Sequence, residues 1–159
     1  MDPTRGYLLD LVTQERLQFQ FNPSELSVKL GASWSDKEPR GSSHPRKQYR
    51  ASKGRTFTLA LKFLRTTADA SDLPERRRLV ESLPFPDYDP AGRLSQGPHP
   101  VRFVFGALTR RCIVEDVTLD LGPWFDPATL EPGEFLATLS LVEQPAGGDL
   151  SRDDVRGGA

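Results

Sequence analysis

Hydrophobic and polar residues alternate in three runs between Val101 and Glu143. Alternation with a period of two is typical of strands that bury one face. Glycine and proline separate the runs, at Gly106, at Gly122-Pro123 and at Pro132-Gly133. The pattern predicts a meander of three half-buried strands. Val101, Phe103 and Phe105 face one way, Ile113, Val117, Leu119 and Leu121 lie along a longer run, and Phe135, Ala137, Leu139 and Leu141 share a face.

The first half of the chain contains four further strand-like runs and one helix signal. The segment Ser71-Asp72-Leu73-Pro74-Glu75 combines a capping side chain, an early proline and an acid near the positive end of the helix dipole. We therefore predict one short helix that ends at Pro84. Two polar stretches, 37–55 and 87–100, show no alternation and are expected to be loops. The strand-like runs lie at 7–12, 17–21, 26–30 and 57–63.

Length and composition indicate one soluble globular domain. The chain has 159 residues, of which 36% are hydrophobic and 27% charged, and its net charge is −1. We expect a β domain over residues 1–143 and a flexible tail over 144–159, where turn formers and charges show no pattern. No apolar run approaches the roughly 20 residues that cross a bilayer. Because no secretory signal is visible either, we expect a protein made in the cytoplasm without direct membrane insertion.

Candidate catalytic and metal-binding residues are few. His44 and His99 each lie next to a proline in separate predicted loops, and Cys112 is distant from both in sequence. Metal sites and cysteine nucleophiles need clustered ligands or a neighbouring base, so a buried structural thiol is the better interpretation of Cys112. The adjacent acids Glu115 and Asp116 would point to opposite faces of a strand and make a poor acid–base pair. With no glycine-rich phosphate motif, the sequence predicts no enzyme, no metal and no cofactor.

The stretch from Arg40 to Arg55 is the one charge feature above background. Charge runs are most often solvated faces, and the functional alternative is contact with a neighbouring subunit or with nucleic acid. Tyr49 is the only aromatic residue within the stretch, so the stacking platform of a single-strand binder is missing and no nucleic-acid binding is expected. Its cations are Arg40, Arg46, Lys47, Arg50, Lys53 and Arg55.

Several residues match motifs of a known family. The run Phe19-Gln20-Phe21-Asn22-Pro23-Ser24-Glu25-Leu26 fits the pattern F-x-F-N-P-x-x-L, and the segment 99–106 fits a later stretch like P-P-x-V-x-F-x-W-G. A turn at Trp124-Phe125-Asp126-Pro127 and a strand that closes on Glu143 follow. In these features, over residues 7–143, the chain resembles the tube-like N-terminal domain of contractile injection system baseplate proteins. That domain is often followed by a LysM domain, which we do not expect in this chain.

The resemblance implies a fold and a structural role. The implied fold is mainly β, a tail-tube-like β-sandwich or barrel with one short α-helix. The implied function is a structural subunit of a phage-tail-like contractile particle, in a six-membered ring at the junction of the spike hub or baseplate and the inner tube. Its expected partners are further copies of itself, the inner tube protein and the spike hub or baseplate proteins. The particle would be a virion or an injection system.

The residues expected in the assembly interface come from three places. They are the corner after the second predicted strand, the basic stretch and the aromatic turn, that is Phe19, Phe21, Asn22, Pro23, Arg46, Lys47, Arg50, Trp124 and Phe125. For the two tryptophans, Trp34 and Trp124, burial in the core is the default interpretation. The alternative function is a generic β-sandwich module that binds peptide or carbohydrate, which a solvent-facing aromatic cluster with a defined pocket would favour.

Overall fold

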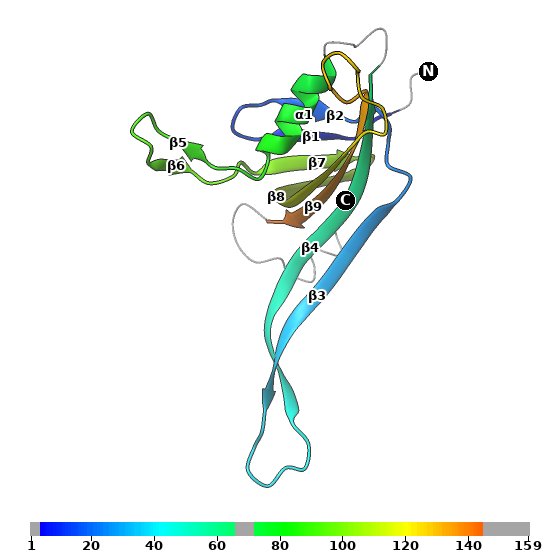
Figure 1. Ribbon diagram of the computed structural model, residues 1–159. Helices are drawn as coiled ribbons and strands as arrows, with labels where there is room; N and C mark the ends of the chain where they lie inside the picture. Colours follow the sequence, from blue (N-terminus) through cyan, green and yellow to red (C-terminus); the bar gives the residue numbers. More distant parts are fainter. Residues whose placement is uncertain (1–3, 66–71, 145–159) are drawn as a thin grey trace.

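The computed structural model describes residues 4–65 and 72–144. These residues contain nine strands and one helix (Figure 1). The prediction of a mainly β fold with one short α-helix is confirmed. The elements are β1 (Tyr7–Asp10), β2 (Arg16–Gln18), β3 (Leu26–Lys37), β4 (Arg46–Leu64), α1 (Asp72–Ser82), β5 (Asp87–Tyr88), β6 (Leu94–Gln96), β7 (Val101–Phe105), β8 (Leu108–Leu121) and β9 (Glu134–Glu143).

Seven strands form one antiparallel sheet in the order β2-β1-β7-β8-β9-β4-β3, and β5 and β6 form a separate small hairpin. Strand β8 joins the two halves of the sheet. Its residues Leu108–Cys112 pair with β7, and its residues Cys112–Leu121 pair with β9. A β-bulge between Val114 and Asp116 follows this change of partner, and bulges bend and twist a strand. The sheet therefore curves so that its two halves face each other across the core.

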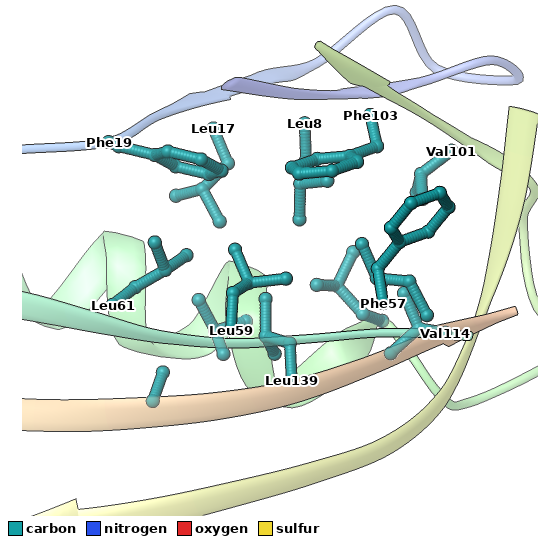
Figure 2. Packing of buried hydrophobic residues seen from close by; sticks show 14 of the residues in the cluster. Leu8, Leu17, Phe19, Phe57, Leu59, Leu61, Val101, Phe103, Val114 and Leu139 are labelled. Carbon is teal, nitrogen blue, oxygen red and sulfur yellow. The ribbon is translucent and has the colours of Figure 1, made fainter. Parts of the chain in front are cut away.

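The hydrophobic core lies between the half-sheet β2-β1-β7 and the half-sheet β9-β4 (Figure 2). The ring of Phe103 on β7 lies 6.4 Å from that of Phe19 and 5.5 Å from that of Phe57 on β4, measured between centroids. Helix α1 covers the side of the core with its buried residues Leu73 and Val80, and the buried Leu83 follows directly after the helix. The alternation predicted for the last strand is confirmed, since its fully buried residues are Phe135, Ala137, Leu139 and Leu141.

The motif after β2 attaches the N-terminal strands to β4. Strand β2 ends at Gln18, before the alternating run in the sequence ends, and Phe19 then points into the core. The side chain of Gln20 takes the place of a neighbouring strand. Its Nε2 donates to the carbonyl oxygen of Leu64 at 3.0 Å, and its Oε1 accepts from the backbone N–H of Leu64 at 2.7 Å. Because β3 begins at Leu26, opposite Leu59 of β4, these two hydrogen bonds supply at Leu64 the partner that a longer β3 would have provided.

Asn22 secures the other side of the same corner. Its Oδ1 accepts from the backbone N–H of Gly6 at 3.0 Å, and its Nδ2 donates to the carbonyl oxygen of Thr4 at 2.8 Å. Pro23 follows and cannot extend a ladder, because it lacks a backbone N–H. The asparagine–proline pair therefore ends the first hairpin and directs the chain towards β3.

The polar stretch 37–55 is not a loop, contrary to the prediction. Strands β3 and β4 remain paired up to Lys37 and Arg46, so only residues 38–45 form the connection. Apolar alternation is missing from this part of the hairpin because both of its faces are largely exposed, which removes the pattern that a half-buried strand shows. The second predicted loop, 87–100, contains the short β5–β6 hairpin. Of the predicted tail over 144–159, only Gln144 lies among the described residues.

Substitutions of the two phenylalanines of the corner motif are expected to differ greatly in their effect on stability. Phe19→Ala removes a fully buried ring and should lower the free energy of unfolding by about 3–5 kcal/mol, as large-to-small core substitutions do. Phe21→Ala is the matched control, because the side chain of Phe21 is 47% exposed, and it should change the value by less than about 1 kcal/mol. Urea titration followed by far-UV circular dichroism measures both, and equal losses would contradict the assignment of Phe19 to the core.

Candidate assembly interface

A long two-stranded arm extends beyond the body of the domain (Figure 1). Strand β4 pairs with β9 only over Thr56–Leu64, and of its preceding residues, 46–53 pair with β3 alone. We call the hairpin segment 30–55 the arm. Two β-bulges interrupt its ladder, one between Lys29 and Gly31 and one between Ser33 and Trp34. Bulges increase the local twist, which explains why the arm departs from the plane of the sheet.

One face of the arm carries an aromatic pair and an ion pair. Trp34 and Tyr49 are cross-strand partners whose rings meet edge to face at 5.6 Å, and they are 56% and 52% exposed. The next partners on that face, Asp36 and Lys47, form an ion pair at 2.6 Å. Cross-strand pairs of these kinds stabilise a hairpin that has no other packing. The prediction that Trp34 is a core residue is therefore wrong.

A cluster of charged residues marks the root of the arm. The carboxylate of Glu143, at the end of β9, accepts from Arg55 Nε at 2.6 Å and lies 3.3 Å from Arg110 Nε. All three side chains are nearly buried. Gly54 allows this close packing, because a Cβ at its position would lie 2.5 Å from the carbonyl oxygen of Glu143. Ion pairs to Glu143 thus connect β4 and β8 to β9 at the point where the arm begins.

Besides the three-residue edge at β2, two long edges of the sheet have no strand partner within the described residues. Strand β3 pairs with β4 along one side, and its other side is free over Leu26–Lys37. Strand β8 pairs with β9 over Cys112–Leu121, but β7 reaches only as far as Cys112. The side of β8 that faces away from β9 is therefore free over residues 113–121. Free edges with unpaired N–H and C=O groups are templates for pairing with another chain.

The turn between β8 and β9 holds two exposed aromatic side chains. Trp124 packs against Gly133, where a Cβ would lie only 1.9 Å from the indole Cε3, and the backbone N–H of Gly133 donates to the carbonyl oxygen of Trp124 at 2.9 Å. The indole nevertheless remains 54% exposed, and Phe125 beside it is also exposed. This turn lies at the end of the domain opposite the arm (Figure 1).

The structure separates the predicted interface residues into one core residue and eight residues of the surface. Phe19 is fully buried within the monomer, so it is unavailable to a partner and is removed from the predicted interface. Pro23 is half-buried. The remaining residues are exposed, and they come from three segments of the chain, the corner, the arm and the aromatic turn, of which the arm lies at the opposite end of the domain from the turn (Figure 1). They are Phe21, Asn22, Arg46, Lys47, Arg50, Trp124 and Phe125.

Sequence reasoning missed the free edges and the hydrogen bonds of Gln20. Alternation identifies the faces of a strand but not its neighbours, so the free side of β8 could not be found before the sheet order was known. A glutamine whose side-chain amide takes the hydrogen-bonding place of a neighbouring strand has no recognisable sequence pattern. Only the position of Gln20 within the corner motif indicated that it could have a structural role.

A histidine bridges two carboxylates at the base of the β5–β6 hairpin. Nδ1 of His99 lies 2.8 Å from Asp10 Oδ2, and Nε2 lies 2.5 Å from Asp87 Oδ2. The hydrogen bonds to Asp10 and then to Asp87 raise the pKa of His99 above its ordinary value, against the effect of burial. Burial alone would raise the pKa of Asp10, but hydrogen bonds from His99 and from the backbone N–H groups of Thr13 and Val12 lower it overall. The protonated imidazole thus links β1 to the hairpin.

The other candidate residues support no catalytic or metal site. Cys112 is buried, as predicted, and burial followed by the negative charge of Glu143 raises the pKa of its thiol to about 12, which keeps it protonated. Within residues 4–65 and 72–144, no three His, Cys, Asp or Glu side chains are grouped to hold a metal ion. In the same part of the chain, no helix is long and apolar enough to cross a membrane.

A shallow hollow of about 480 Å³ lies between β2 and α1. Its lining is mainly polar, and no aromatic side chain contributes to it among the described residues. The residues that line it are Glu15, Arg16, Leu17, Gln18, Glu75, Arg76 and Leu79.

Comparison with known proteins gives one family match. A family model described as "Contractile injection system tube protein" matches residues 10–122. Sixteen chains of solved structures are similar. They include the crystal structure of SPP1 Dit (gp 19.1), whose title calls it a paradigm of the hub adsorption apparatus in phages that infect Gram-positive hosts. The two are 15% identical with a TM-score of 0.45, over 87% of this chain and 49% of that chain. This chain thus spans about half the length of the Dit chain. No curated protein matches.

The bridge at His99 predicts a stability that depends on pH. The pKa of His99 is raised in the folded state, so the bridge contributes fully below the unfolded value of 6.5 and is lost as the pH rises through the raised folded value. His99→Gln should therefore lower the free energy of unfolding more at about pH 5.5 than at about pH 9. Urea titrations of both chains at the two pH values measure this. His44→Gln, which changes the exposed histidine of the arm, should show no such dependence, and an equal loss for His99→Gln at both pH values would contradict the bridge.

Proposed function

Because the chain belongs to the contractile injection system tube protein family, we propose that it forms a closed ring in the axial part of a phage-tail-like contractile particle. The ring lies at the junction between the spike hub or baseplate and the inner tube. It contains six copies, as the resemblance of the corner motif implies. The partners are the neighbouring copies, the inner tube protein and the hub or baseplate proteins. The protein is made in the cytoplasm and incorporated into the particle there.

The observation that carries this proposal is the presence of two free edges on opposite sides of one four-stranded section. This section has the strand order β8-β9-β4-β3. Among the described residues, the outward side of β8 over 113–121 and the outward side of β3 over Leu26–Lys37 have no partner strand. Every neighbouring pair within it is antiparallel. Since the number of strands is even, β3 of one copy and β8 of the next run in opposite directions when the copies are related by rotation about an axis along the strands. Repeated pairing of β3 with β8 is a heterologous contact, and such contacts form a ring when the rotation between copies closes.

The face of this section that points away from the core also suits a tube wall. Cross-strand partners on it carry small polar side chains, among them Thr58 with Ser140, and Thr138 with Thr118. A polar face of this kind needs no covering by other protein. In a ring it would form a hydrated inner surface, while the core and α1 would lie outside it.

The alternative of a peptide- or carbohydrate-binding module has weaker support. The hollow between β2 and α1 has no aromatic platform among the described residues that line it. The exposed aromatic residues of the arm and of the β8–β9 turn do not line it, and the arm and the turn lie at opposite ends of the domain (Figure 1). We also assign no catalytic step to the chain, because the family to which it belongs is one of structural tube proteins.

Thiol cross-linking in the producing cells tests the ring. A full-length chain with Ser27→Cys on β3 and Thr118→Cys on β8 should give a ladder of cross-linked species that ends at six copies when a short bis-maleimide is added. Both positions are exposed on the face away from the core, and the native Cys112 is buried. The control pairs Thr118→Cys with Ser95→Cys on the β5–β6 hairpin, which should give no ladder.

Mass spectrometry of the same particles tests the position of the ring. Inner tube and hub or baseplate proteins should be captured together with the chain. A chain that remains monomeric in cells that make intact particles would contradict the ring. Capture with inner tube protein alone would contradict the junction.

A further inference from the structure

The two free edges of the four-stranded section carry opposite charges. We propose that ion pairs between Lys29 and Lys53 of one copy and Asp116 and Asp120 of the next select the pairing of β3 with β8. This inference rests on the ring proposed above and names the surfaces that join its copies.

The edge formed by β3 is cationic. Lys29 is paired in register with Thr56, which lies on the face opposite the buried Phe57, so Lys29 also points away from the core. Gly31 lies two residues further along and therefore on the same face. Its cross-strand partner is Lys53, whose Cδ lies 3.7 Å from the place where a Cβ of Gly31 would be. Because Gly31 has no side chain, the Lys53 side chain extends across β3 towards the free edge.

The free part of β8 is acidic on the same face of the sheet. Asp116 is paired with Ser140 and Asp120 with Leu136, and these partners alternate with the buried residues Leu139 and Ala137 of β9. Both aspartates are therefore directed away from the core, as Lys29 is on β3.

These four charged side chains have no ion-pair partner of their own. Asp116, Asp120, Lys29 and Lys53 are all exposed, and within the described residues none of them is in a salt bridge. Glu115, the extra residue of the bulge, adds a further exposed acid beside Asp116. Charges placed on edge strands usually prevent unwanted sheet extension. Here the two edges have opposite charges. The electrostatic repulsion that prevents sheet extension is therefore absent only when a β3 edge meets a β8 edge.

Like-to-like contacts are disfavoured by the same charges. Pairing of β3 with β3 would place Lys29 and Lys53 of two copies together, and pairing of β8 with β8 would do the same for the aspartates. Like charges in an interface are costly and exclude wrong partners. Twofold pairing through identical edges would also produce a dimer instead of a ring. The charge pattern therefore selects the one contact that repeats around an axis.

Charge reversal within the cross-linking chain tests the inference. Lys29→Glu with Lys53→Glu, or Asp116→Lys with Asp120→Lys, should each reduce the cross-linked ladder about tenfold, because both edges then have the same sign. The chain with all four substitutions should recover the ladder, since its acidic β3 again meets a basic β8. The control Arg78→Glu with Arg93→Glu makes the same change in net charge as the lysine reversals, at exposed positions away from both edges, and should leave the ladder intact. Circular dichroism establishes that each variant is folded.

The outcomes separate this inference from the proposed ring. If the parent cysteine chain gives no ladder, the ring itself fails and the charge selection fails with it. If the parent gives a ladder that both two-residue reversals leave unchanged, the ring stands and the charge selection is overturned. A folded chain with all four substitutions that gives no ladder would also overturn it.

Discussion

Unpaired backbone groups at the edges of the sheet are the constraint on which the rest of this structure depends. An antiparallel sheet that does not close must leave a row of N–H and C=O groups without partners at each end. One end, at β2, is only three residues long. At the end of β4, where β3 has not yet begun, the Gln20 amide supplies the hydrogen bonds of a missing strand to Leu64. The edges at β3 and along β8 are long, and no comparable side chain covers them among the described residues. The sheet therefore has one short edge, at β2, and two long edges that remain available for pairing with another chain.

The change of partner along β8 produces both the core and one of these edges. Because β7 ends opposite Cys112, the sheet can bend there, and β1, β2 and β7 fold over β4 and β9 to enclose the phenylalanine cluster. The same ending leaves the rest of β8 without a second neighbour. Lengthening β7 would cover the edge and flatten the bend. A compact core and an available edge are therefore two results of one short strand.

The sequence was sufficient to predict the strands that bury one face, but not the relation between strands. Alternation located the runs around Phe57, Val101 and Phe135, and the capping signal located α1, because burial and helix capping leave local patterns. The arm was predicted to be a loop, since a hairpin with two solvated faces has no such pattern. Phe19 alternates like the neighbouring residues of its strand, and sequence gave no reason to prefer a core position over an interface. The free edge of β8 depends on the length of β7 relative to a distant strand, which only the folded chain determines.

The charged cluster at the root of the arm explains where the body of the domain ends. Along β9 every second side chain is buried and apolar from Phe135 to Leu141, and the next position in that series is Glu143. A carboxylate there would be costly without partners, and Arg55 and Arg110 provide two. Their guanidinium groups close the core at the level where β4 loses β9 as a neighbour. Beyond this level β3 and β4 have only each other, so the arm is held at its root by ion pairs and is left exposed along its length for contact with another chain.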